Sequence, residues 1–285
     1  MHLDPGPLVV VLVLLAAVMH ATWNAVAHAA TDRVAGFGLI SLSTFVVGVV
    51  LVAVGGPVGW HWFWFAVLSA SLHVSYVLLL MATYQVADLS RAYPLSRGTG
   101  VALTAVASIV LPRSPLGPDV VAGVVLVVAG LVGVTFAGPP LTGRDRRGIA
   151  TALATGTAIA GYTVIDGLAV SGGAPVLPYG GWLMALHSGV VVAYALARRR
   201  RAILHLPRHQ TLMALGGGVV SVLAYGLVLL AQTSGALAAV AALRELSIAV
   251  GVMIGAFVLH EAAARKRLLP ALVLTAGAVV LALSI

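Results

Sequence analysis

Three ionisable side chains interrupt otherwise apolar stretches of this sequence. Arg97 lies in AYPLSRGTG, and Arg244 and Glu245 are neighbours in AALRELS. An unpaired charge near the middle of a membrane-spanning helix costs about 2.5–3.5 kcal/mol on insertion scales, so each of the three needs a partner. Neighbouring residues on a helix point about 100° apart, so Arg244 and Glu245 are not expected to neutralise each other cleanly.

Each charge has candidate partners elsewhere in the sequence. Glu245 could pair with Arg97, and Arg244 could face Asp166, a substrate anion or water. One interpretation is that these groups handle a substrate or a coupling ion. The other is that they form a structural ion-pair network between the two halves of the chain.

The helix around Arg97 is predicted to be irregular. Pro94 removes one backbone hydrogen bond and clashes with the carbonyl four residues earlier, and Gly98 and Gly100 weaken the helix further. A weakened helix that carries an arginine is typical of a mobile element lining a cavity. The alternative is a static kink from which Arg97 extends to the membrane interface.

A polar stripe in the first apolar stretch has two interpretations. His20, Asn24 and His28 are spaced four residues apart on one helix face, with Trp23 beside them. They either hydrogen-bond a neighbouring helix or face a substrate, and for His28 we favour the first. Two histidines eight residues apart, with no carboxylate on that face, make a poor metal site, so we expect no metal.

Further aromatic and polar side chains share helix faces and suit an amphipathic organic solute better than a bare ion. They are His73 with Tyr76, Tyr93 with Ser96, Tyr162 with Asp166, and Ser221 with Tyr225 and Gln232; Trp182 and His187 complete the set. We predict no catalytic residue. The predicted substrate-binding or coupling residues are Trp23, Asn24, Tyr76, Tyr93, Ser96, Arg97, Tyr162, Asp166, Trp182, Tyr225, Arg244 and Glu245.

These residues must be positioned by membrane-spanning helices. The chain of 285 residues is 61% hydrophobic and 8% charged, too few charges for a soluble protein of this size. A helix needs about 20 apolar residues to cross the bilayer. Ten stretches meet that length and leave almost nothing for a soluble domain: 7–30, 34–54, 62–84, 92–111, 117–137, 148–170, 178–197, 211–233, 236–259 and 267–285.

The net charge of +8 is distributed as membrane insertion requires, and it does not suggest a nucleic-acid partner. Thirteen of the sixteen Lys and Arg residues fall in odd-numbered loops. We therefore predict cytoplasmic odd loops and both termini outside. The first stretch has no Lys or Arg before it and exceeds the usual length of a signal peptide, so it is expected to remain as a helix. Cysteine is absent, which excludes disulfides and thiolate chemistry.

The second half of the sequence resembles the first. The segment from Ser75 aligns with that from Ala224, and an offset of about 148 residues holds through three spans. The predicted organisation is a repeat over 1–137, a linker over 138–147 and a repeat over 148–285. Because each repeat has five spans, the second must enter the membrane from the opposite side. The fold class is therefore an all-α polytopic membrane protein with two inverted five-helix repeats around a central cavity.

The fifth and tenth spans are predicted to be scaffold. Small residues recur every four positions at Ala129, Gly133 and Ala137, and again at Ala278 and Ala282. Such spacing lets helices approach closely. Neither span has a charge near its middle. We expect them to pack on each other, away from the cavity.

Four motifs resemble those of EamA-type members of the drug/metabolite transporter superfamily. They are HATWNAVAH from His20, AYPLSRGTG from Ala92, GYTVIDG from Gly161 and AALRELS from Ala241. Leu259–Glu261 stands where the family often has a Gly-Glu pair, whereas Leu111-Pro112-Arg113 departs from the corresponding position in the first repeat. The resemblance covers essentially the whole chain and implies ten helices, a central cavity and movement of small organic solutes, often outward.

We therefore expect a secondary transporter of the plasma membrane that exports a small amino-acid-like or anionic metabolite by alternating access. No Walker A motif is present, no cofactor is expected, and a coupling proton could bind Glu245 or Asp166. The partners are the substrate and the lipid bilayer; monomer and homodimer stay open. The alternative is an intramembrane enzyme acting on a lipid-linked substrate, and a passive channel is a third class.

Overall fold

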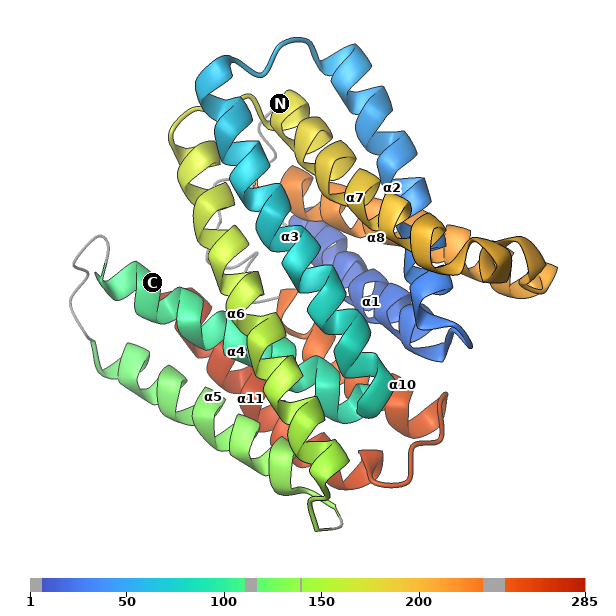
Figure 1. Ribbon diagram of the computed structural model, residues 1–285. Coiled ribbons are helices and arrows are strands. Elements are labelled where there is room, and N and C mark those ends of the chain that lie inside the picture. The colour runs from blue at the N-terminus through green and yellow to red at the C-terminus, as the bar shows by residue number, and fades with distance from the viewer. Residues whose placement is uncertain (1–6, 111–116, 139, 233–243, 285) are drawn as a thin grey trace.

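The chain folds as a bundle of helices (Figure 1). The computed structural model describes residues 7–110, 117–138, 140–232 and 244–284, and these residues contain ten α-helices and no strand. The helices are α1 (Pro7–Ala29), α2 (Arg33–Gly55), α3 (Trp60–Val86), α4 (Leu89–Val110), α5 (Pro118–Phe136), α6 (Gly143–Ser171), α7 (Val176–His205), α8 (Arg208–Gln232), α10 (Ser247–Phe257) and α11 (Ala264–Ser284).

Seven of these helices are long and apolar enough to cross a membrane, namely α1, α2, α3, α5, α6, α7 and α8. The prediction of a polytopic helical membrane protein is confirmed at that level. Of the other three, α4 and α11 carry arginines and α10 has 11 residues. The predicted departure at Leu111-Pro112-Arg113 lies outside the described residues.

Local signals decide where several helices begin. The side chain of Asp32 caps α2 by accepting from the Ala35 N–H at 3.0 Å. Thr142 and Asp145 form a capping box at the start of α6, so this helix begins at Gly143, within the predicted linker. Such caps satisfy N–H groups that have no partner inside the helix.

The predicted ninth span is not a continuous helix in its described part. Residues 233–243 lie outside the described residues, Glu245 and Leu246 form a turn, and α10 begins at Ser247. Arg244 and Glu245 therefore lie at a helix break, and not in the regular helix that the sequence predicted. The break changes how these two side chains are directed.

Helices α5 and α11 lie side by side, as predicted (Figure 1). Their contact depends on glycines, because a Cβ on Gly130 would lie 2.5 Å from the backbone N of Leu274, and one on Gly133 would lie 2.8 Å from Pro270. Gly133 lies in this contact, as predicted. The second contacting residue is Gly130, whereas the predicted Ala129 is exposed. The spacing of small residues was therefore correctly identified as a packing signal, but the face was partly wrong.

Candidate functional site

A cavity of about 160 Å³ lies where seven helices of the bundle meet. Its walls come from α1, α2, α3 and α4 of the first half and from α6, α7 and α8 of the second, together with Arg244. Nine of the twelve predicted site residues line it: Trp23, Asn24, Tyr76, Tyr93, Ser96, Arg97, Tyr162, Tyr225 and Arg244. The other three, Glu245, Asp166 and Trp182, lie behind this lining or beside it.

Two arginines of the cavity share one carboxylate oxygen. Arg97 Nη2 donates to Glu245 Oε1 at 2.7 Å, and Arg244 Nε lies 3.5 Å from the same oxygen. The side chains of Arg97 and Glu245 are 10% and 4% exposed, and that of Arg244 is 27% exposed. The predicted pairing of Glu245 with Arg97 is confirmed. At the turn, Arg244 and Glu245 come within 3.5 Å of each other but form no hydrogen bond, in line with the expectation that they would not neutralise each other cleanly.

Asp166 has a partner other than Arg244. Tyr179, on α7, donates its hydroxyl to Asp166 Oδ1 at 2.6 Å. Trp182, one turn along α7 from Tyr179, packs edge-on against Phe63 with ring centroids 5.1 Å apart. Both predicted residues therefore hold α7 against α6 and α3 beside the cavity.

Three neighbouring rings, of which two are stacked, form one wall of the cavity. His73 and Tyr162 lie parallel with centroids 3.8 Å apart, and His187 lies 5.1 Å from His73. Tyr76 meets Tyr162 edge-on at 5.8 Å. The sequence associated both histidines with the cavity but not with each other, because α3 and α7 are brought together only by folding. Among the described residues, no group of three or more His, Asp or Glu side chains is placed to hold a metal ion.

The polar stripe of α1 divides between the two interpretations. Asn24 donates to the His20 carbonyl and accepts the Tyr84 hydroxyl, both at 2.8 Å. His28 Nε2 lies 3.2 Å from the Ala87 carbonyl, outside the cavity lining. Asn24 thus both lines the cavity and joins α1 to α3, whereas His28 only joins helices, as favoured from its position.

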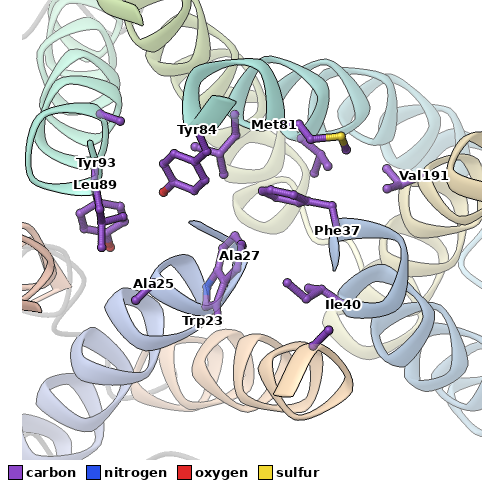
Figure 2. Packing of buried hydrophobic residues seen from close by; sticks show 14 of the residues in the cluster. Trp23, Ala25, Ala27, Phe37, Ile40, Met81, Tyr84, Leu89, Tyr93 and Val191 are labelled. Atoms are coloured by element: carbon purple, nitrogen blue, oxygen red, sulfur yellow. The ribbon is translucent and has the colours of Figure 1, made fainter. Parts of the chain in front are cut away.

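A buried cluster that includes Trp23 of α1 joins this helix to α2, α3 and α4 (Figure 2). Figure 2 shows the ring of Phe37 directed toward Tyr84, and their centroids are 6.3 Å apart. Tyr84 also meets His28 edge-on at 5.2 Å. Phe37 lines the cavity as well, and Tyr84 is 2% exposed. The sequence analysis missed both residues, because a single aromatic in an apolar helix has no distinguishing pattern.

A charged network joins the two halves at one end of the bundle. The connections that follow α1, α3, α5, α7 and α10 lie at this end. They are the odd-numbered loops of the sequence analysis, so we call this end of the bundle the odd-loop end. Glu261 accepts from the N–H groups of Leu89 and Ser90 at 2.6 and 2.9 Å, and so caps α4. The resemblance pointed to Glu261 by position but gave it no role. A carboxylate at a helix N-terminus pairs free N–H groups and complements the helix dipole.

Two arginines complete this network. Arg267, 1% exposed, donates to Asp88 at 3.0 Å and to the Ser90 hydroxyl at 2.7 Å. Arg91, also buried, pairs with Asp145 of the α6 capping box. The sequence analysis counted both arginines among the thirteen Lys and Arg residues of the odd-numbered loops. They instead lie within α11 and α4, each paired with a carboxylate that comes from the other half of the chain.

Comparison with known proteins gives a fold and no function. No model of a protein family matches the sequence, and no curated protein matches it. Twelve chains of solved structures match. One, described only as "Crystal structure of protein", has a TM-score of 0.62, 19% sequence identity, and coverage of 98% of this chain and 97% of that chain. At that identity the match shows that the two chains share a fold along nearly their whole length.

Proposed function

We propose that this protein is a secondary transporter that moves a small organic metabolite across the plasma membrane by alternating access, in the direction of export. The observation that carries the proposal is the central cavity. It is lined by both halves of a helical membrane protein and contains two arginines, several tyrosines and polar side chains. Polar groups inside a membrane protein typically mark a substrate or ion pathway. The resemblance to EamA-type transporters points to the same function.

The pattern of helix contacts supports two inverted repeats as the basis of the mechanism. Helix α2 packs on α7, and α5 packs on α11. Three further contacts each have a counterpart. The contact of α3 with α6 corresponds to that of α8 with α1, and the contact of α2 with α8 corresponds to that of α7 with α3. The contact of α4 with α5 corresponds to that of α10 with α11. A two-fold axis relating 1–137 to 148–285 would generate these pairs. Repeats of five helices would then be inverted, with the substrate site between them.

Alternating access requires contacts that can open at each end of the cavity in turn. The network of Glu261, Arg267 and Arg91 is suited to this at the odd-loop end, because its partners come from opposite halves. Parting the halves there would break charged hydrogen bonds that water can replace. A coupling proton could bind Glu245, whose second oxygen Oε2 is buried without a hydrogen-bond partner among the described residues, or Asp166.

The test is flux in proteoliposomes. Purified protein is reconstituted into sealed vesicles loaded with a mixture of small metabolites, and efflux is followed by mass spectrometry against protein-free vesicles. We expect saturable, protein-dependent efflux of a narrow set of solutes. Arg244→Lys should insert and fold but lose flux, since lysine cannot reproduce a two-point guanidinium contact. Arg208→Lys, an exposed residue, is the matched control.

Three outcomes would contradict the proposal. If no solute leaves the vesicles in a protein-dependent manner, the protein is not a transporter of the solutes supplied, and the proposal is contradicted. Rapid flux without saturation would indicate a channel. Chemical conversion of a lipid-linked substrate by the purified protein would indicate the intramembrane enzyme.

A further inference from the structure

The two cationic side chains of the cavity lie against a single carboxylate. Arg97 and Arg244 both line it, and both depend on Glu245 Oε1. Among the described acidic residues, Asp166 is the other one near the cavity, and it accepts the hydroxyl of Tyr179 outside the lining. Two guanidinium groups therefore share one carboxylate. Asp166 forms an ion pair with neither arginine among the described residues, so a bound anion would give the two guanidinium groups a second direct partner.

Hydrogen-bond donors without partners lie around the same arginines. Seven cavity-lining side chains each have a buried nitrogen or oxygen atom that can donate and that has no hydrogen-bond partner among the described residues: His20, Trp23, Tyr93, Ser96, Arg97, His187 and Arg244. Trp23 and Ser96 are 8% and 2% exposed. Donors held in this way typically serve a ligand rich in acceptor atoms, because an unsatisfied buried donor is costly.

The geometry of Arg97 leaves a contact edge free. Its Nη2 is used by Glu245, whereas its Nε has no hydrogen-bond partner. A guanidinium that is held by one protein carboxylate can still present its second edge to a planar oxyanion. Arg244, 27% exposed, is the more accessible of the two and lies beside the same carboxylate.

Size and wall chemistry limit the rest of the ligand. The cavity volume is about 160 Å³, close to the ~150 Å³ of an engineered cavity that takes up benzene. Rings of Trp23, Tyr76, Tyr93 and Tyr162 line it. Aromatic walls favour flat apolar groups, which they contact by stacking or edge-on.

We propose that the cavity binds a small organic monocarboxylate whose apolar body is no larger than a single ring. The carboxylate lies at Arg97 and Arg244, and the ring lies against the tyrosines. The inference rests on the proposed function only in using the same cavity. Two guanidinium groups beside one carboxylate select an anion over a cation or a neutral analogue.

The test compares three ligands that share one ring and differ in charge: benzoate, benzylammonium and benzyl alcohol. Binding to the purified wild-type protein is measured by isothermal titration and by thermal shift, since a ligand of the folded state raises the unfolding temperature. We expect benzoate to bind and stabilise, and the other two to do neither. This comparison needs no variant, so it is independent of folding defects.

Variants then locate the carboxylate. Arg244→Lys should weaken benzoate binding about tenfold or more, as expected for loss of a charge-assisted hydrogen bond. Arg208→Lys should leave it unchanged. The inference is overturned if benzoate does not bind, if benzyl alcohol or benzylammonium binds equally well, or if folded Arg244→Lys and Arg97→Lys both bind benzoate as the wild type does.

Binding and transport fail separately in these experiments. Benzoate binding together with no protein-dependent efflux of any solute from proteoliposomes would contradict the transporter and preserve the inference. Protein-dependent flux of cationic or neutral solutes, with no carboxylate binding, would preserve the transporter and overturn the inference.

Discussion

The shared carboxylate predicts an unusual order of stabilities. Removing one partner of a buried ion pair typically costs about 3–5 kcal/mol, because the other charge is left uncompensated. Glu245 is the common partner of Arg97 and Arg244. We expect Glu245→Met, which keeps much of the side-chain volume, to destabilise the protein by that full amount, since it strands two neighbouring cations.

Arg97→Met should cost less. Glu245 would still have Arg244, whose Nε is 3.5 Å from the same oxygen. The loss then approaches that of a single charge-assisted hydrogen bond, about 1.5–3 kcal/mol. The double variant should be more stable than Glu245→Met alone, because it removes the buried cation along with the anion and leaves only the more exposed Arg244.

The assay is reversible unfolding in mixed micelles of mild detergent and dodecyl sulfate, followed by tryptophan fluorescence. Arg208→Met, at an exposed position, controls for the loss of a charge and should change the free energy of unfolding by less than about 0.5 kcal/mol. The reasoning is refuted if Arg97→Met costs as much as Glu245→Met, or if the double variant is less stable than Glu245→Met.

Three further predictions concern packing, capping and orientation. Gly130→Leu should reduce folded protein by overpacking against Leu274, by about 1–3 kcal/mol or more, whereas exposed Ala129→Leu should be neutral; equal yields on size-exclusion chromatography would contradict this. Glu261→Ala should cost about 0.5–2 kcal/mol and Glu261→Gln less, because glutamine keeps one acceptor for α4; the reverse order in the unfolding assay would rule out capping. A reporter fused after Ile285 should be active only if it works outside the cytoplasm.

The sequence by itself determined the class of protein and much of the cavity lining. Long apolar stretches need no tertiary information to indicate membrane helices, because the bilayer sets their length. Charges inside such stretches must have partners or face a cavity. That rule identified Arg97, Arg244 and Glu245, and helix periodicity placed Tyr76 and Tyr93 on faces with other polar groups.

Tertiary structure decided which partners meet. The neighbouring rings of His73, Tyr162 and His187 join three helices that are distant in sequence. Arg91 and Arg267 were indistinguishable in sequence from the exposed arginines of the loops, and only the packing of α4, α6 and α11 buries them.

The break before α10 was likewise beyond the sequence pattern. The apolar run through 236–259 satisfies the length of a span, and its composition does not indicate that the helix stops near Glu245. Intrinsic helix propensities differ by less than about 1 kcal/mol per residue for most side chains, so tertiary contacts can override them. Here the turn brings Arg244 to the oxygen of Glu245 that Arg97 also contacts, and that geometry places two cations against one carboxylate beside the cavity.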